Sequence, residues 1–327
     1  MPQFNYNKYF KTSVIIISVF LLLAAFFNYI VDPYNLMGNN KTGIYFCDER
    51  QAKDAILKYA HQAVIIGSSK TGYIDPDALS CYRFYNASLR ATVPEEIFFY
   101  LKKYLRDEKL VLIGFDFYMF NERQFPFVNI TDWDDVTYSV AEYLLGANIL
   151  KLSWKTVEKW YKGEVSHCMK ENGQFIYPGD AQKSLSDDPQ QYEKQYNDIL
   201  KGLVKHHYDK ISFSDRRMDY VRKIKELLEE KNIPYAVFIN PKNSDVLVAL
   251  RQLEAYELFV KWQKEMKTIF PNIYDFSSSK YSAREGFYRG DPYHYNNATG
   301  KAFLNEIIKD YCYDESTRQN VFLELVK

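Results

Sequence analysis

Residues 63–70 have the sequence Ala-Val-Ile-Ile-Gly-Ser-Ser-Lys, an apolar run that ends in a glycine and two serines. A short continuous apolar run is typical of a strand buried on both faces, the usual strand of a parallel sheet. Glycine lets the chain turn sharply and serine often begins a helix, so the stretch predicts a strand that passes directly into a helix.

Strands and helices alternate on both sides of this stretch. Further strands are expected at residues 82–86, 110–117, 235–239 and 272–276. Helices are expected at residues 48–60, 95–104, 244–268 and 297–311, with one more that begins at the N-cap Ser214. Parallel strands need long crossover connections, so the alternation predicts an α/β three-layer sandwich with a mostly parallel central sheet. Ligands bind at the carboxyl ends of the strands in such sheets.

The N-terminal region contains one long uncharged segment, residues 12–31. At about 1.5 Å per residue its twenty residues match a hydrocarbon core of about 30 Å, so a transmembrane helix is expected. Lys8 and Lys11 precede the segment and Asp32 is the first charge after it, so the positive-inside rule predicts a cytoplasmic tail of residues 1–11 and an extracytoplasmic domain. A cleaved signal peptide is the alternative, but it would normally have a shorter apolar region.

The remaining chain is long enough for one large domain with a well-buried core. A linker is expected at residues 32–44 and the domain at residues 45–327. Within the domain, residues 120–212 are the least regular part, with a helical segment expected at 137–162, and they are interpreted as an insertion. The insertion either shapes a cleft or extends the core.

Composition excludes some classes of function. Lys and Arg together number 42, as do Asp and Glu, so no net field favours nucleic acid. Cys47, Cys81, Cys168 and Cys312 allow two disulfides in an oxidising compartment, with three possible connectivities, or four reduced cysteines. No Cys-x-x-Cys pair or Cys/His cluster suggests zinc, so neither a metal nor a cofactor is expected.

Ser69, at the carboxyl end of the first expected strand, is the leading candidate for a nucleophile, and Ser68 is the second. A serine needs a base, and His294 stands out among the five histidines because Asp291 precedes it by three residues. Asp291 could hold one imidazole nitrogen and leave the other free to accept the serine proton. The alternatives are that the serine only caps a helix and that the histidine is a solvated loop residue.

The order of these motifs resembles the SGNH (GDSL-like) hydrolase and acyltransferase superfamily. The resemblance implies a flavodoxin-like fold, with Ser69 as nucleophile and Asp291 and His294 completing a catalytic triad. The wider resemblance is to membrane-anchored envelope proteins, both DltD-like and of alginate O-acetylation. It implies a bacterial cell-envelope location, a polysaccharide or polymer acceptor, and a multi-span membrane O-acyltransferase as the acyl donor partner.

Three further residues lie where the superfamily forms its oxyanion site. Asn86 occupies the region of the second family block, although an asparagine that ends a strand would look the same. In the third block the family has Gly-x-Asn, whereas this chain has Gly114, Phe115 and Asp116. An ionised Asp116 would repel an oxyanion, so it could be protonated, orient another group, bind an acceptor hydroxyl or be a structural strand-end residue. Lys70 is expected to be solvated at the start of a helix; the alternative is that it attracts an anionic group.

The leading functional hypothesis is an O-acyltransferase, with acetyl as the expected group, that acts on an envelope polymer through a serine ester. An esterase that removes acyl groups from the same polymer is one alternative. A non-catalytic glycan-binding or scaffold protein is another.

Overall fold

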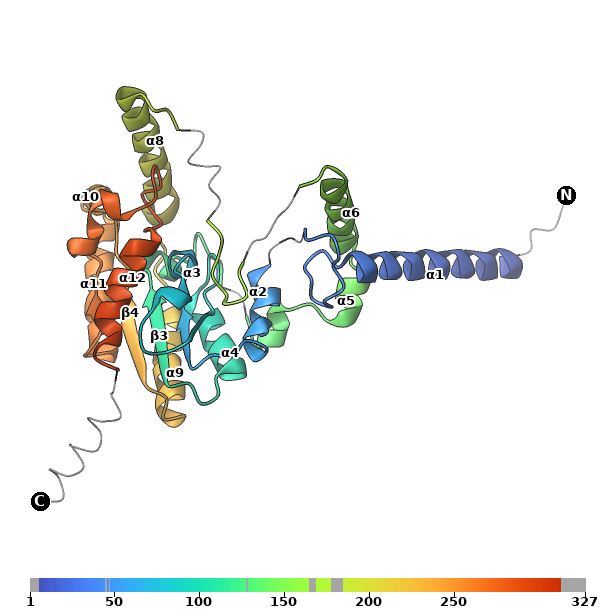
Figure 1. Cartoon of the computed structure of the whole chain (residues 1–327), viewed down its shortest axis with the longest axis horizontal. Helices are drawn as coiled ribbons and strands as arrows, with labels where there is room; N and C mark the ends of the chain where they lie inside the picture. The colour runs from blue at the N-terminus through green and yellow to red at the C-terminus, as the bar shows by residue number, and fades with distance from the viewer. Residues whose placement is uncertain are drawn as a thin grey trace, which may run out of the picture. The chain divides into compact units, whose positions relative to one another are not determined.

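The computed structural model describes residues 6–44, 46, 48–127, 129–164, 169–177 and 185–312 (Figure 1). These residues form two compact units. Unit 1 comprises the described residues within 1–53 and 132–169, and unit 2 comprises those within 54–131 and 170–327. The described residues of one part of the expected insertion, 132–164 and 169, therefore group with the N-terminal helix and not with the sheet.

Unit 2 is an α/β structure built on a parallel sheet. Its five strands are β1 (Ala63–Ile66), β2 (Phe84–Asn86), β3 (Leu110–Phe115), β4 (Tyr235–Ile239) and β5 (Tyr274–Asp275). Their order in the sheet is β2-β1-β3-β4-β5, and all four neighbouring pairs are parallel. Each strand lies within the range expected from the sequence, because a short apolar run between two helices leaves few other positions for a buried strand.

Both faces of the sheet are buried. One apolar cluster contains alternate residues of the central strands and four residues of the last helix, namely Ala63, Ile65, Leu110, Leu112, Ala236, Phe238, Phe303, Leu304, Ile307 and Ile308. Successive side chains of a strand point to opposite faces, so the intervening buried residues, such as Val64 and Val111, point the other way. Figure 1 shows the last helix on one side of β3 and α4 on the other.

The helices of unit 2 are α3 (Ser69–Gly72), α4 (Pro94–Tyr104), α8 (Pro189–Tyr208), α9 (Asp215–Glu230), α10 (Ser244–Leu250), α11 (Ala255–Ile269) and α12 (Asn297–Ile308). Ser214 caps α9 as expected, because its hydroxyl accepts the backbone N–H of Arg217. The single helix expected at 244–268 is two helices, separated by a turn at residues 251–254.

Helix α8 was not recognised in the sequence because its first residues are strongly polar. The Asp188 side chain caps it by accepting the N–H of Gln191, and Pro189 occupies the first helical position. Proline is favoured there because its missing N–H would have no partner within the helix. The Asp-Pro pair was thus a local signal for this helix.

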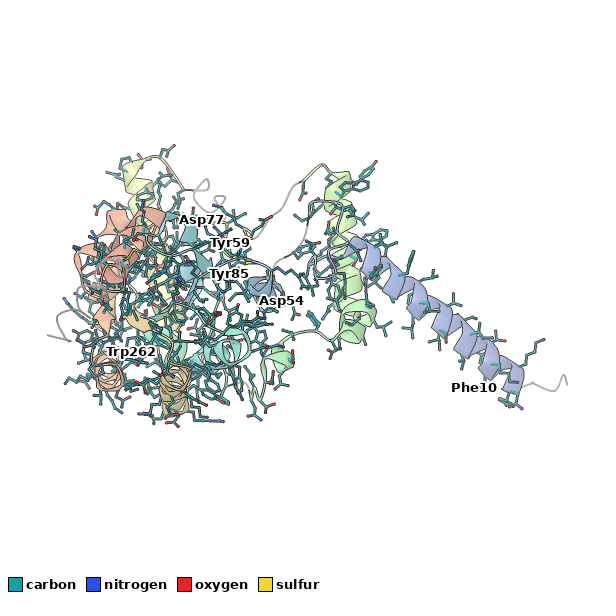
Figure 2. All side chains as sticks on the ribbon, turned by 60° about the horizontal axis from the view of Figure 1, so that its bottom comes forward. Phe10, Asp54, Tyr59, Asp77, Tyr85 and Trp262 are labelled. Atoms are coloured by element: carbon teal, nitrogen blue, oxygen red, sulfur yellow. A yellow bond between two sulfur atoms is a disulfide. The ribbon has the colours of Figure 1, made fainter. Side chains whose placement is uncertain are left out.

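Unit 1 contains α1 (Tyr6–Val31), the short α2 (Glu49–Ala52), α5 (Val140–Leu145) and α6 (Ala147–Tyr161). Helix α1 contains an 18-residue window with a mean hydropathy of 2.7, and the helix is long and apolar enough to cross a membrane. Almost all of its side chains up to Leu23 are exposed, and Phe10 projects away from the helix in Figure 2.

The end of α1 is tied into unit 1 by polar contacts. The Asn28 amide donates to the carbonyl of Leu144 at 2.8 Å and accepts the Ser153 hydroxyl at 2.8 Å. Asp32 accepts the Tyr143 hydroxyl at 2.7 Å and three backbone N–H groups of residues 36–39. The segment expected as a linker, residues 32–44, is therefore a set of turns organised around one aspartate.

A disulfide joins Cys81 to Cys312, which are 231 residues apart. This bond leaves only one of the three possible connectivities for two disulfides. Cys47 and Cys168 lie outside the described residues.

Candidate active site

Ser69 and His294 meet at the carboxyl end of β1. Ser69 is the first residue of α3, directly after the turn that follows β1, and His294 lies in the loop before α12. The Ser69 hydroxyl oxygen is 3.0 Å from His294 Nε2. His294 Nδ1 is 2.7 Å from a carboxylate oxygen of Asp291. With the Nδ1 proton directed to Asp291, Nε2 is left to accept the serine proton. We call Ser69, His294 and Asp291 the Ser69 triad.

The location follows from the topology of the sheet. The chain leaves β1 to pair with β2 on one side, and later returns to place β3 on the other side. Doubly wound sheets bind their ligands at such a reversal, at the carboxyl ends of the two strands that flank it, and Ser69 follows one of these strands, β1.

Four hydrogen bonds hold the Asp291 carboxylate. Besides His294 Nδ1, it accepts the Tyr177 hydroxyl at 2.7 Å and the backbone N–H groups of Tyr293 at 2.8 Å and His294 at 3.0 Å. Burial alone would raise the pKa of Asp291, but the hydrogen bonds and charge of His294, together with Tyr177, lower that pKa to about 2. Asp291 is therefore ionised at neutral pH and can balance an imidazolium.

Aromatic rings fix the plane of the imidazole. The rings of Tyr73 and Tyr293 stand edge-on to His294, with centroids at 5.0 Å and 4.7 Å. Nevertheless, the side chains of His294 and Asp291 keep 19% and 21% of their surface exposed. The triad is thus held in place and remains within reach of solvent or a small substrate.

A second histidine lies on the other side of Tyr293. The ring of His207 stacks on Tyr293 with a centroid distance of 5.0 Å and an interplanar angle of 12°. Burial lowers the pKa of His207 to about 3, so this imidazole is neutral at physiological pH. Since Ser69 contacts His294 and not His207, only His294 is placed to act as its base.

Ser68 has a different environment from Ser69. Its side chain is fully buried, donates to an Asp116 oxygen at 2.8 Å and accepts the Lys70 backbone N–H at 3.2 Å. The structure therefore brings Ser69, and not Ser68, to the histidine. Ser68 instead caps α3 and links it to the end of β3.

Asp116 is the centre of a buried polar network. It accepts Ser68 and the Asn240 amide at 3.0 Å, and its other oxygen is 3.0 Å from Lys70 Nζ. We call Ser68, Lys70, Asp116 and Asn240 the Asp116 network. The carboxylate thus orients other groups, one of the roles expected for it, and the Lys70 ammonium balances its charge.

The expectation that Lys70 is solvated is wrong, because only 2% of the residue is exposed. Its side chain runs beneath the site, from α3 to the carboxyl ends of β3 and β4, where it also donates to the carbonyl of Pro241 at 3.4 Å. Burial lowers the pKa of the Lys70 ammonium, and the charge of Asp116 opposes that shift. The sequence could not show this, since the partner is 46 residues away.

A second lysine, Lys242, is buried nearby. Its ammonium donates to the Tyr208 hydroxyl at 2.8 Å. Burial lowers the pKa of Lys242 to about 8, although the charges of Asp116 and Asp275 act in the opposite direction.

The other two candidate residues serve the local packing. The Asn86 amide donates to the carbonyls of Thr71 and Ile74 at 2.8 and 3.0 Å, and so satisfies carbonyls at the end of α3. A Cβ atom on Gly114 would lie only 2.7 Å from the Phe238 ring and 2.8 Å from the Thr71 methyl carbon. The side chain of Asn86 is therefore not free for an oxyanion, and Gly114 is required by the close packing of the strand ends.

The helix expected after β1 is a single turn, because α3 has only four residues. The positive end of a longer helix could help to stabilise an oxyanion. One turn has few aligned peptide dipoles, so backbone N–H groups, and not a macrodipole, are the donors that α3 can offer.

Sequence reasoning missed several residues around the site. Asn240 and Lys242 follow β4, and the rule that ligand sites lie at the carboxyl ends of parallel strands could have identified them. Tyr177 comes from the irregular region of the sequence, where no local pattern indicated it. In the part of the chain that the structure describes, no group of three or more His, Cys, Asp or Glu residues could hold a metal ion.

Comparisons with known proteins do not add a family to this description. No protein-family model and no curated protein matches the chain.

Proposed function

We propose that this protein is a membrane-anchored, extracytoplasmic O-acyltransferase of the SGNH type that acts through an ester on Ser69. The observation that carries the proposal is the 3.0 Å contact of the Ser69 hydroxyl with His294, which Asp291 orients from the other side. A neutral serine is a weak nucleophile, and this arrangement is the usual way in which proteins activate it.

The proposed reaction has two steps. Ser69 attacks the carbonyl carbon of the acyl donor while its proton passes to His294 Nε2, and Asp291 stabilises the imidazolium. His294 then gives that proton to the leaving group, and the acyl-serine remains. In the second step an acceptor hydroxyl loses its proton to His294 and attacks the acyl-serine, so the acyl group is transferred and Ser69 regains its proton.

The strand order supports the assignment to the SGNH type. The order β2-β1-β3-β4-β5 is that of flavodoxin-like sheets, and Ser69 and Asp116 follow the two strands that flank the point where the order reverses. The Asp-x-x-His segment before the last helix supports the same assignment.

Two observations support an uncleaved anchor and an extracytoplasmic domain. Asn28 and Asp32 make buried hydrogen bonds with α5 and α6, so cleavage within α1 would remove contacts on which unit 1 depends. The disulfide between Cys81 and Cys312 fits an oxidising compartment. Together with Lys8 and Lys11 before the apolar segment, this favours a cytoplasmic N-terminus.

The acceptor and the donor partner follow from the resemblance to envelope proteins. We propose a cell-envelope polysaccharide as acceptor, acetyl as the transferred group, and a multi-span membrane O-acyltransferase as the protein that delivers the acyl group.

An esterase is the second candidate. His294 and Asp291 are each about one-fifth exposed, so water can reach the base. The charge of Asp116, which by itself would repel an oxyanion, is balanced by Lys70.

The proposal is tested with the full chain in a non-ionic detergent and a fluorophosphonate probe that labels activated serines. Ser69→Ala and His294→Ala should abolish labelling, whereas Ser68→Ala, the matched control, should retain it. Loss of labelling in Ser68→Ala alone, or no labelling of folded wild type, would contradict the proposed nucleophile.

Transfer and hydrolysis are separated by a second measurement. A chromogenic acetyl ester is supplied with and without an oligosaccharide acceptor. Product release that needs the acceptor, with acetyl found on the sugar, indicates an acyltransferase. Release at the same rate in water alone indicates an esterase.

A further inference from the structure

Helix α6 and the outer half of α1 enclose an apolar groove within unit 1. The groove has a volume of about 730 Å³. Its α1 wall is formed by Phe20, Leu23, Ala24 and Phe27, and its α6 wall includes Leu150 and Trp154. Trp154 is 68% exposed and lies beside the exposed apolar residues of α1, so it extends the apolar surface of the groove.

The same α6 wall carries two lysines, together with Glu158. Lys151 and Lys155 line the groove one helical turn apart, so their ammonium groups can reach one phosphate. Neither of them makes an ion pair within the residues that the structure describes. In contrast, Lys159 and Lys162 of the same helix are paired with Glu164 and Glu158 at 2.7 Å.

The position of the groove along α1 places it toward the extracytoplasmic end of the proposed span. The uncharged segment of α1, residues 12–31, extends about 30 Å, and the groove residues 20–27 lie mostly in its C-terminal half. From Ala24 onward α1 is covered on one face only, where Asn28 and Val31 are buried and Asn28 makes hydrogen bonds with α5 and α6. Helix α6 crosses this end of α1 and does not run alongside it (Figure 1).

We propose that this groove binds an anionic phospholipid of the outer leaflet. The acyl chain lies against Phe20, Leu23 and Trp154, and the phosphate is bound by Lys151 and Lys155. The apolar wall is continuous with the membrane-spanning part of α1, and the lysines complement a negative headgroup. The inference rests on the membrane anchor in the proposed function, but not on the chemistry of Ser69.

The test uses the full chain reconstituted in nanodiscs with equal amounts of phosphatidylglycerol and phosphatidylcholine. After extraction into mild detergent, the lipid that remains bound is identified by native mass spectrometry. Wild type should retain phosphatidylglycerol in preference to phosphatidylcholine. Each of Lys151→Gln and Lys155→Gln should lower its retention about fivefold, the effect of one lysine near an anionic surface.

The matched control is Lys159→Gln, which removes one charge from the same helix outside the groove and should leave retention unchanged. Trp154→Ser should reduce retention of the lipid, while Trp160→Ser, another exposed tryptophan on α6, should not. Thermal unfolding of each variant checks that it is folded.

Three results would overturn the proposal: equal retention of the two lipids by wild type, equal losses in Lys155→Gln and Lys159→Gln, or displacement of the lipid by excess inorganic phosphate, which would indicate a phosphate site. Ser69→Ala should bind lipid like wild type. Loss of lipid binding with normal fluorophosphonate labelling would therefore contradict the lipid site alone. Normal lipid binding without labelling would contradict only the catalytic proposal.

Discussion

The Ser69 triad and the Asp116 network contain the same kinds of residue a few ångströms apart, yet they differ in accessibility. In the Ser69 triad, serine, histidine and aspartate are each partly exposed, and the serine has the imidazole as its partner. In the Asp116 network, the serine and aspartate are at most 2% exposed and a buried lysine balances the charge. Because Ser68 is buried, its hydroxyl cannot be reached by a substrate, and the Asp116 network supports the structure instead.

The largest effect expected from this difference is on reactivity. Asp291→Asn should lower the rate of fluorophosphonate labelling about 10⁴-fold, because the imidazole loses the partner that sets its tautomer and balances its charge. Stability should change much less, since Asp291 is partly exposed. The measurement is the second-order labelling rate with thermal unfolding as control. A rate within tenfold of wild type would show that Asp291 does not support the base.

The next largest effect should be on stability. Asp116→Asn should lower the free energy of unfolding by about 3–5 kcal/mol, because it leaves the Lys70 charge buried and unpaired. The measurement is urea denaturation of the full chain, with the ¹⁹F signal of fluorotryptophan at Trp262 as the probe. This signal reports on unit 2, in which Trp262 is the one tryptophan.

The control for this prediction is Lys70→Met combined with Asp116→Asn, which should recover most of the lost stability because no charge is left unpaired. A fully stable Asp116→Asn would contradict the ion pair. A 10⁴-fold loss of labelling in its folded fraction would mean that the Asp116 network takes part in the reaction, so that the two clusters are not distinct.

Lys242 should give the stability of unit 2 a particular dependence on pH. Its pKa of about 8 in the folded protein lies below the value of about 10.4 in the unfolded chain. Below pH 8 both states are protonated. Between pH 8 and about 10.4 the unfolded state binds more protons, so stability should rise with pH by about 3 kcal/mol.

Lys242→Met should abolish that rise. The unfolding free energy of variant and wild type is measured by the ¹⁹F signal of Trp262 from pH 7 to 11. The titration of the many tyrosines is common to both proteins, so the difference between the two free energies reports on Lys242. A difference that does not vary with pH would show that the Lys242 pKa is not lowered.

The smallest effect is expected for Ser68→Ala. It removes one hydrogen bond to Asp116 and the cap of α3, so the unfolding free energy should fall by about 1–2 kcal/mol. Lys70 and Asn240 still hold Asp116, and labelling of Ser69 should persist. Urea denaturation tests the role of Ser68 in stability, and the labelling rate of the same sample tests whether Ser69 keeps its reactivity.

The sequence by itself determined the class of the sheet. Apolar runs such as 63–66 and 235–239, separated by helical segments, require parallel strands, and this pattern depends only on local periodicity. The apolar helix at the N-terminus and the selection of Ser69, Asp291 and His294 as candidates came from the same local signals. Helix α8 was missed because its start is polar, although its cap was visible.

Only the tertiary structure decided between adjacent residues of the same type. Ser68 and Ser69 are both serines after a glycine, and their roles diverge because one side chain points to Asp116 and the other to His294, 225 residues away. The burial of Lys70 and the grouping of residues 132–169 with α1 depend likewise on partners distant in sequence. Local propensity carries no information on such partners, since they meet only when the whole sheet has assembled.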